Sequence, residues 1–437
     1  MQAKLKQHIA THFPFLMEKK LLIAISGGLD SVVLAHLLYA FDFDISFAHC
    51  NFNLRGADSD ADEAFVKELG KKLNIKTHTI SFQTEAYIAK NRVSTQIAAR
   101  ELRYHWFDEI IEKYQFDYVA TAHHADDNLE TFLINLTRGT GLEGLTGIPP
   151  INKNIVRPLL LFSREEIEHF AIENNITWRE DLSNKSTKYT RNKIRLQVTP
   201  ILKEINPNLL ESFQKTISYL QESKYIINDA IDEVRAKVTS TNSSGMLQFD
   251  ISKVNELSSP KAYLFELLKK YGFTEWNDVA DLLTAQSGKQ VISKSYRLIK
   301  DREFLLVSPL KKNEEVLEFY IDAHTKEVKD PISLSFEITT IIDTESTNVI
   351  TLDFEKLTFP LALRKWKNGD YFYPKGMQGR KKLSKFFKDE KFSLVDKENA
   401  WLLCSNDQVV WIINHRVDKR FVSAENTNKC LKINTMP

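Results

Sequence analysis

The stretch SGGLDS, from Ser26 to Ser31, lies between an apolar run at Leu21–Ile25 and a helical pattern at Val32–Phe41. A buried strand, a glycine turn and a helix start form a cradle for phosphate, because unpaired N–H groups at the helix start point into the turn and the helix dipole favours an anion. The two glycines let the backbone approach the phosphates. Asp30 is an acid beside this cradle, which suits a site where a cation bridges acid and phosphate. The sequence therefore predicts a nucleotide site that uses Mg²⁺.

This loop differs from two widespread nucleotide-binding loops. The Walker A spacing G-x-x-x-x-G-K-[ST] is absent, since no lysine follows the glycines, and the G-x-G-x-x-G pattern is absent too. An ordinary glycine turn that caps a helix is the alternative without a ligand. The strand and helix patterns on either side favour the phosphate site.

Residues 1–200 alternate between strand and helix patterns, which predicts an α/β fold with a doubly wound, mostly parallel sheet. The expected strands are Leu21–Ile25, Ile45–His49, Lys76–Phe82 and Tyr118–Ala122. The expected helices lie near Ser31–Phe41, Ser59–Leu73, Thr95–Tyr114, Asp127–Leu136 and Arg164–Asn174. Ligands bind at the carboxyl ends of the strands in such sheets. The polar segments that follow the first and fourth strands should therefore meet at one edge.

The second polar segment is HHADDNLET, His123–Thr131. Asp127 and Glu130 are three residues apart and share one face of the predicted helix. Two acids near a nucleotide can hold Mg²⁺ or accept a proton from an attacking amine. We expect His123 and its neighbour to contact phosphate or to donate hydrogen bonds, because hard oxygen ligands suit Mg²⁺ better than imidazole does.

The rest of the chain predicts two further domains. Residues 205–310 form a mainly helical domain with an apolar stripe at helical spacing and a hairpin at Val291–Val307, which turns at Lys300–Arg302. The charged stretch Lys311–Asp330 marks a boundary, and residues 330–437 form a small mixed α/β domain with one helix at Lys381–Lys388. The expected domains are therefore 1–200, 205–310 and 330–437.

The net charge of the chain is only +1, but basic residues are concentrated in two segments. Arg364–Lys391 holds ten lysines and arginines against three acids, and Asn184–Arg195 holds five basic residues and no acid. Such segments favour a polyanionic partner, and a solvated lysine-rich surface is the alternative.

The chain has three cysteines, Cys50, Cys404 and Cys430, and no C-x-x-C. This pattern argues against a disulfide framework, a zinc ribbon and an iron–sulfur site, and it suits a reducing compartment. We expect a cytoplasmic protein with neither a signal peptide nor a membrane span.

Together these motifs resemble the tRNA(Ile)-lysidine synthetase family of the PP-loop ATP pyrophosphatase superfamily, over nearly the whole chain. The matching motifs are SGGLDS (Ser26–Ser31), HCNFNLR (His49–Arg55), AARELRY (Ala98–Tyr104), HHADDNLET (His123–Thr131), RGTGLEGL (Arg138–Leu145), RPLL (Arg157–Leu160), WREDLSN…YTRNKIR (Trp178–Arg195), GDYFYPKGMQGRKKLSKFFKDEK (Gly369–Lys391) and HRVDKRF (His415–Phe421).

The resemblance implies a two-step reaction on an isoleucine tRNA with a CAU anticodon. ATP adenylates O2 of the wobble cytidine and releases pyrophosphate. The ε-amine of free lysine then attacks C2 and expels AMP. The product, lysidine, pairs with A instead of G, so the codon changes from AUG to AUA. The implied cofactors are ATP and Mg²⁺, and the oligomeric state is left open, with a homodimer as one arrangement.

The resemblance also implies roles for particular residues. The residues for chemistry are Asp30, Asp127 and Glu130, with Asp30 and Asp127 as Mg²⁺ ligands. The residues for ATP are Ser26, Gly27, Gly28, Leu29, Asp30, Ser31, His49, Arg100, His123 and Gly139. The residues for tRNA are Arg103, Arg191, Arg195, Lys381, Lys382, Lys385 and Lys388. The four arginines at 100, 103, 191 and 195 would contact nucleotide or RNA phosphate.

The chain departs from the family pattern at two positions. Phe52 replaces the second histidine of the usual His-x-Asn-His-x-Leu-Arg, and Asn128 replaces the glutamine that commonly follows the paired acids. We expect both replacements to be tolerated, because the phosphate loop and the acids are intact.

Two other functions remain as alternatives. A PP-loop tRNA 2-thiolation enzyme would use the same ATP chemistry, but it needs cysteines for sulfur transfer or for an iron–sulfur cluster. A tRNA-binding protein without catalysis would suit the basic C-terminal segment. Asp30, Asp127 and Glu130 favour an enzyme, since a pure binder has little use for acids beside a phosphate loop.

Overall fold

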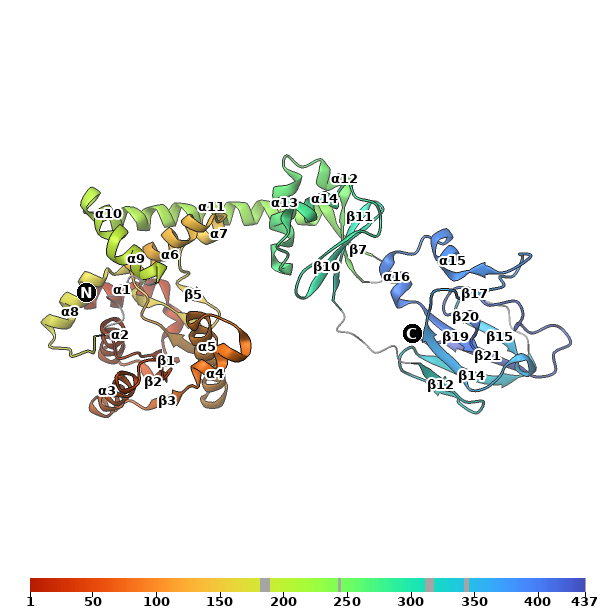
Figure 1. The fold of residues 1–437 in the computed structure, drawn as a ribbon, viewed down its shortest axis with the longest axis horizontal. Coiled ribbons are helices and arrows are strands. Elements are labelled where there is room, and N and C mark those ends of the chain that lie inside the picture. The colour runs from red at the N-terminus through yellow and green to blue at the C-terminus, as the bar shows by residue number, and fades with distance from the viewer. Residues whose placement is uncertain (181–188, 243–244, 311–317, 342–345, 437) are drawn as a thin grey trace. The chain divides into compact units, whose positions relative to one another are not determined.

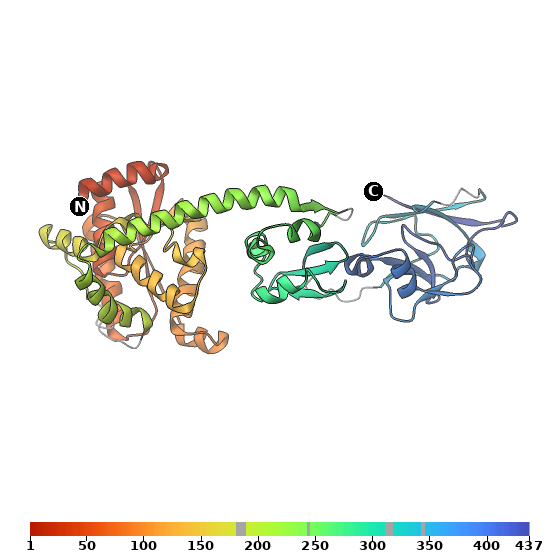
Figure 2. The same ribbon diagram turned by 90° about the horizontal axis from the view of Figure 1, so that it is seen from above.

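The computed structural model describes residues 1–180, 189–242, 245–310, 318–341 and 346–436. The chain divides into two compact units, Met1–Asn228 and Asp229–Pro437. The long helix α11 (Leu209–Val238) contributes to both units, and Figures 1 and 2 show it as one continuous helix. Every helix among the described residues is too short or too polar to span a lipid bilayer.

The first unit is built on a six-stranded sheet that is parallel except for its last strand (Figure 1). The strands, in spatial order, are β3 (Thr77–Ser81), β2 (Asp44–Asn51), β1 (Lys20–Ala24), β4 (Tyr118–Ala120), β6 (Ile155–Val156) and β5 (Ile151–Asn152). The register places Ile23 of β1 beside Phe47 of β2 and Ala120 of β4. The predicted parallel sheet is therefore confirmed.

Helices cover both faces of this sheet, because successive residues of β1 are buried on opposite sides. Leu21 and Ile23 pack into one core cluster with α2 and α8, whereas Leu22 packs with Trp106 and Phe107 of α5 on the other face. The helices of the unit are α1 (Gln2–His12), α2 (Leu29–Ala40), α3 (Ala57–Leu73), α4 (Thr84–Asn91), α5 (Thr95–Tyr114), α6 (Ala125–Arg138), α7 (Leu142–Leu145), α8 (Arg164–Glu173), α9 (Thr190–Lys193) and α10 (Thr199–Ile205). Short helical turns are η1 (Pro14–Leu16), η2 (Pro158–Leu161) and the π-helical η4 (Ile194–Val198).

The second unit begins with helices and a five-stranded antiparallel sheet. The strands, in spatial order, are β7 (Thr239–Thr241), β8 (Leu247–Asp250), β11 (Phe304–Pro309), β10 (Tyr296–Asp301) and β9 (Gln290–Ile292). The helices are α12 (Ile251–Asn255), α13 (Pro260–Leu268), η5 (Lys269–Tyr271) and α14 (Trp276–Asp281). The hairpin expected at Val291–Val307 is β10–β11, and it turns between Asp301 and Phe304. The other strands of this sheet have only three or four residues, too few for an alternating pattern to identify them in the sequence.

The remainder of the second unit mixes short strands with helices, but the sequence predicts one helix at Lys381–Lys388, whereas the structure has a helix that begins at Leu383 and a second one at Leu394–Asn399. One sheet contains β12 (Phe319–Ile321), β16 (Leu361–Lys365), β19 (Trp401–Ser405) and β20 (Gln408–Ile412). Another contains β13 (Glu327–Val328), β14 (Leu334–Thr339), β21 (Cys430–Thr435) and β15 (Val349–Asp353). The smaller elements are η6 (Phe354–Lys356), β17 (Tyr371–Phe372), β18 (Lys381–Lys382), α15 (Leu383–Asp389) and α16 (Leu394–Asn399). Thus β12 and β13, which fall within the charged stretch 311–330, belong to these sheets; residues 311–317 lie outside the described residues.

Candidate active site

The SGGLDS loop is a closed turn held by its own hydroxyl groups. The backbone N–H of Ser26 donates to Oγ of Ser31 at 3.1 Å, and the backbone N–H of Gly28 donates to Oγ of Ser26 at 3.3 Å. Oγ of Ser31 donates to the carbonyl of Gly28 at 3.0 Å. Gly27 has φ = +92°, a conformation that side chains rarely adopt, and α2 begins directly after Gly28. The first N–H groups of α2 therefore open into the turn, as the sequence predicts.

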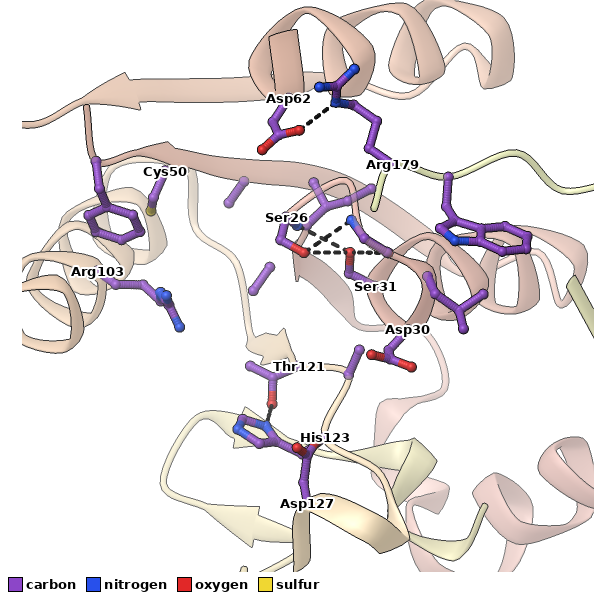
Figure 3. Close-up of a pocket in the computed structure, with 18 of the residues that line it drawn as sticks. Ser26, Asp30, Ser31, Cys50, Asp62, Arg103, Thr121, His123, Asp127 and Arg179 are labelled. Carbon is purple, nitrogen blue, oxygen red and sulfur yellow. Dashed lines mark hydrogen bonds and ion pairs between the residues drawn. The ribbon is translucent and has the colours of Figure 1, made fainter. Parts of the chain in front are cut away.

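The loop lies at the point where the strand order of the sheet reverses. The strands β2 and β3 extend the sheet from one side of β1, while β4 lies on its other side. The SGGLDS loop follows β1, and the segment HHADDNLET follows β4. Open α/β sheets bind ligands at the carboxyl ends of the strands at such a point. A cavity of about 550 Å³ lies there, and Figure 3 shows the loop and the residues Thr121–Asp127 on two sides of it.

Many of the residues that the sequence analysis selected line this cavity. They are Ser26, Gly28, Leu29, Asp30, Ser31, Arg103, His123, Asp127, Arg191 and Arg195. Five others of the first unit are not part of its lining: Gly27, His49, Arg100, Glu130 and Gly139. His49 is buried and bonds through Nδ1 to the carbonyl of Ile25 at 2.9 Å, and Arg100 lies over the ring of Tyr104. Gly139 ends α6 with φ = +71°.

Asp30 presents a carboxylate oxygen without a partner beside the phosphate loop. Its Oδ1 is shielded from solvent and has no hydrogen-bond partner among the described residues. Burial raises the pKa of Asp30. Its Oδ2 lies 3.8 Å from Nε2 of His124, and the same nitrogen lies 3.4 Å from Oδ2 of Asp127. One imidazole therefore stands between the two carboxylates.

These two acids fit Mg²⁺ better than a transition metal. Among the described residues, no group of three or more histidines, cysteines and acids is gathered as a metal site. Mg²⁺ usually binds one or two carboxylates and takes its remaining ligands from phosphate and water. The shielded Oδ1 of Asp30 is an oxygen of the right kind, and it lies in the first turn of α2, beside the phosphate loop.

Glu130 is fully buried and forms a two-pronged ion pair with Arg195. Nε and Nη2 of Arg195 lie 2.6 and 3.0 Å from the two oxygens of Glu130, and Nη2 also lies 3.1 Å from Oδ1 of Asp127. Arg191 lies further out, with its Nε 3.8 Å from Oε2 of Glu130 and its Nη2 2.7 Å from Oγ1 of Thr131. Both arginines therefore join the acids of α6 to the segment 189–198. The first part of the basic segment Asn184–Arg195, residues 184–188, lies outside the described residues.

The protonation of these groups differs with their surroundings. Burial raises the pKa of Glu130, and Arg195 offsets only part of this effect. Burial acts in the same direction on Asp127, but its interactions with His124 and Arg195 outweigh it, so the pKa of Asp127 is lowered. Burial lowers the pKa of His123 to about 4, and its Nδ1 lies 3.0 Å from Oγ1 of Thr121. His123 is therefore neutral near pH 7.

The two residues that flank Asp127 hold the framework. Asp126 accepts a hydrogen bond from the backbone N–H of Arg164 at 2.8 Å and pairs with Nζ of Lys203 at 2.7 Å. Asn128, one of the two departures from the family pattern, accepts the backbone N–H of Ile148 at 2.6 Å. The amide at position 128 thus fixes the loop after α7.

A second charged cluster, which is not among the site residues predicted from the sequence, lies on the cavity wall. Asp62 pairs with Arg179 through Nε and with Arg55 through Nη2, at 2.7 Å for the latter. The backbone N–H of Arg179 also donates to the carbonyl of Gly27 at 3.0 Å. Arg55 and Arg179 both lie in motifs that match the family, so the motifs pointed to these two residues. The carboxylate that they share, Asp62, lies on α3 and could not be inferred from the spacing of the motifs.

The basic residues of the second unit differ in exposure. Lys382, Lys385 and Lys388 are exposed, whereas Lys381 is half-buried and pairs with Asp389 at 2.8 Å. Arg364, counted in the basic segment Arg364–Lys391, is buried and pairs with Asp370 through both terminal nitrogens, at 2.8 and 2.9 Å. Only part of the basic segment is therefore available to a partner.

The chain is similar to known proteins along nearly its whole length. Family models match a PP-loop domain at residues 1–202, a TilS substrate binding domain at 242–310 and a TilS substrate C-terminal domain at 361–434. A tRNA(Ile)-lysidine synthase of Parabacteroides distasonis is 41% identical and covers 95% of each chain. Another, of Bacteroides thetaiotaomicron, is 38% identical over 99% of each chain. One of Bacillus subtilis is 30% identical over 93% of this chain and 92% of that one. Nearly the full length is matched, and the chain belongs to the tRNA(Ile)-lysidine synthase family.

Proposed function

We propose that this protein ligates free lysine to C2 of the wobble cytidine in the CAU-anticodon isoleucine tRNA. Membership of the family supports the reaction, and the PP-loop domain implies the use of ATP. The observation that carries the proposal is the cavity where the SGGLDS loop, Asp30 and Asp127 meet. A phosphate loop and two acids at one cavity suit the activation of a carbonyl oxygen by ATP.

In the first step, O2 of the cytidine attacks the α-phosphorus of ATP, and pyrophosphate leaves. The N–H groups at the start of α2 and the hydroxyls of Ser26 and Ser31 would bind the phosphates. Asp30 and Asp127 would hold Mg²⁺, which neutralises phosphate charge when bound. Arg103 would contact phosphate from the opposite wall, where Figure 3 shows its side chain.

In the second step, the ε-amine of lysine attacks C2, and AMP leaves. Free lysine carries an ammonium group near neutral pH, so a base must remove a proton before the attack. Glu130 is our candidate, because its raised pKa makes it a better proton acceptor than an ordinary glutamate. Its carboxylate already binds the cationic Arg195, and the lysine ammonium would take over part of that contact.

The tRNA backbone would bind the exposed lysines Lys382, Lys385 and Lys388. The half-buried Lys381 would support α15 through Asp389 and contact RNA less directly. Light scattering of the purified protein, alone and with tRNA, would decide between a monomer and the homodimer that the sequence analysis left open.

The test is incorporation of radiolabelled lysine into a transcript of isoleucine tRNA with a CAU anticodon. We expect labelling that requires ATP and Mg²⁺ and that disappears when the wobble cytidine is replaced by uridine. The Asp30→Asn variant, which should incorporate little lysine, tests whether the labelling depends on this cavity. Absence of label from the wild-type protein, despite tight tRNA binding, would overturn the proposal.

The surroundings of the cysteines argue against the alternative of a tRNA 2-thiolation enzyme. Cys50 lines the cavity, but burial raises the pKa of its thiol to about 12, and burial also raises the pKa of Cys404 to about 12. A thiol must ionise to act as a nucleophile. Sulfur transfer would therefore require a thiolate where burial disfavours it. Sulfur incorporation into the transcript, assayed in parallel, would instead support this alternative.

A further inference from the structure

A series of side-chain contacts runs from Arg103 on α5 through Phe52 and Phe82 back to Trp106 on the same helix. The guanidinium carbon of Arg103 lies 5.4 Å from the centre of the Phe52 ring. Phe52 stacks on Phe82, with ring centres 5.5 Å apart and 23° between the planes. Phe82 contacts Trp106 edge-on at 6.5 Å. Since Trp106 follows Arg103 by three residues on α5, the rings brace Arg103 against its own helix.

The place of Phe52 on the cavity wall is fixed by its backbone. Its carbonyl accepts a hydrogen bond of 2.6 Å from Oγ1 of Thr84, which is buried at the start of α4. The preceding residue, Asn51, accepts the backbone N–H of Phe82 at 2.8 Å. The segments that carry the two stacked rings are therefore joined by hydrogen bonds, which keeps the backbone of Phe52 beside that of Phe82.

Arg103 and the Phe52 ring lie together at the cavity. Both residues line the cavity. Among the described residues no ion pair or hydrogen bond of the Arg103 guanidinium is seen, and the Phe52 ring is an aromatic face that it contacts. A cation is attracted to the face of an aromatic ring, and a guanidinium held in this way keeps its N–H groups available for a phosphate.

We propose that Phe52 is a positioning residue for the ligation reaction, because its ring holds Arg103 toward the cavity for contact with a phosphate group. The role of the phosphate rests on the proposed function, whereas the contact between ring and guanidinium rests on geometry alone. An imidazole at this place would become a cation at low pH and repel Arg103. The phenyl ring keeps the contact at every pH.

The test is a double-mutant cycle on the rate of lysine incorporation in single turnovers. Phe52→Leu removes the aromatic face and Phe52→Tyr keeps it, and each is made with Arg103 and with Arg103→Gln. We expect Phe52→Leu to lower the rate about tenfold and Phe52→Tyr to change it less than about twofold. With Arg103→Gln, Phe52→Leu should have no further effect, because the two residues act as one unit. A raised KM for ATP would assign the phosphate to ATP, and a raised KM for tRNA would assign it to RNA.

Tyr114→Leu is a matched control, since its ring lies under Nζ of Lys76 at 4.7 Å in the same unit but outside the cavity. Thermal unfolding of each variant separates activity from stability, and Phe52→Met, which keeps the volume without a ring, replaces Phe52→Leu if that variant unfolds. Equal losses from Phe52→Leu in both backgrounds, or a Tyr variant as slow as the Leu variant, would overturn the proposal. An inactive wild-type protein would instead count against the proposed function.

Discussion

Asp127 and Glu130 stand three residues apart on α6 and contact the same Arg195, yet their pKa values move in opposite directions. Glu130 is fully buried, and the effect of desolvation on its pKa outweighs the opposite effect of Arg195. Asp127 also has His124 beside it, so attraction outweighs desolvation. Acids whose surroundings separate their pKa values can take different roles in one reaction. We therefore propose that Asp127 acts in the ATP step and Glu130 in the lysine step.

Asp30→Asn and Asp127→Asn should each reduce AMP formation by at least about 100-fold, because each removes a carboxylate charge that Mg²⁺ needs. The tRNA dissociation constant should change less than about twofold, as measured by filter binding. Thermal unfolding serves as the control for folding. If AMP forms at the wild-type rate in either variant, that acid has no part in the ATP step.

The Arg195 guanidinium favours the ionised form of Glu130, so Arg195→Ala should raise the pKa of Glu130 further. A base works only when deprotonated, and activity is therefore lost as the pH falls through its pKa. The acid limb of the lysine-incorporation rate should move to higher pH in this variant, with a rate at least about tenfold lower at pH 6.

Lys203→Ala is the comparison for this pH profile, because it removes a cation from Asp126 instead. Its acid limb should stay in place. An unmoved limb in Arg195→Ala would exclude Glu130 as the base.

The acids could be located from the sequence because they follow strands directly and share one motif. The partner of Glu130 could not be predicted, since Arg195 is 65 residues away and reaches it through a π-helical turn. The sequence analysis assigned Arg195 to phosphate. The structure places its guanidinium on two carboxylates, which leaves its contact with phosphate a prediction.

Among the secondary-structure elements, the SGGLDS loop depends most on a single conformation. Gly27→Ala would force a side chain into φ = +92° and should cost about 1–2 kcal/mol. We expect the Tm to fall by roughly 2–8 °C and the KM for ATP to rise, because the turn opens. Gly141→Ala, at a negative φ with no atom within 4 Å of the added carbon, should change the Tm by less than about 2 °C. Equal effects of the two substitutions would show that the loop is not strained by a side chain.

Long elements with clear ends could be predicted from the sequence, and short ones could not. The helix Thr95–Tyr114 has the predicted bounds, and Ser94 caps it by accepting the N–H of Ile97. In contrast, α1 shows only two buried residues, Leu5 and Ile9, and β5 and β6 have two residues each. Periodicity needs several turns or alternations before it identifies an element.

In the molecule as a whole, the cavity lies in the first unit and the exposed lysines lie in the second. Mutations should therefore be able to impair the ligation reaction and the binding of the tRNA backbone separately. Neutralising Lys382, Lys385 and Lys388 together should weaken tRNA binding and reduce the slope of log K against log salt by about 2–3, because each lost phosphate contact accounts for about 0.7–0.9.

Filter binding at several salt concentrations measures this slope. The control is the pair Lys71 and Lys72, two exposed lysines at the end of α3, whose neutralisation should leave the slope unchanged. An unchanged slope in the triple variant would show that α15 does not bind the tRNA backbone. Charge counting identified this basic segment, but it could not reveal that Arg364 and Lys381 are occupied by Asp370 and Asp389.

The start of α6, residues 125–130, limits which substitutions this chain can accept during evolution. Within five residues, Asp126 binds α8 and α10, Asn128 binds the loop after α7, and Asp127 and Glu130 both contact Arg195. A substitution at Asp126 or Asn128 would shift the neighbouring acids Asp127 and Glu130, and a substitution at either acid would disturb the contacts of Asp126 and Asn128. Variation that adapts the protein to new conditions should therefore accumulate elsewhere, and a substitution within this segment should keep the chemistry of the side chain, as Asn128 keeps an amide where the family commonly has glutamine.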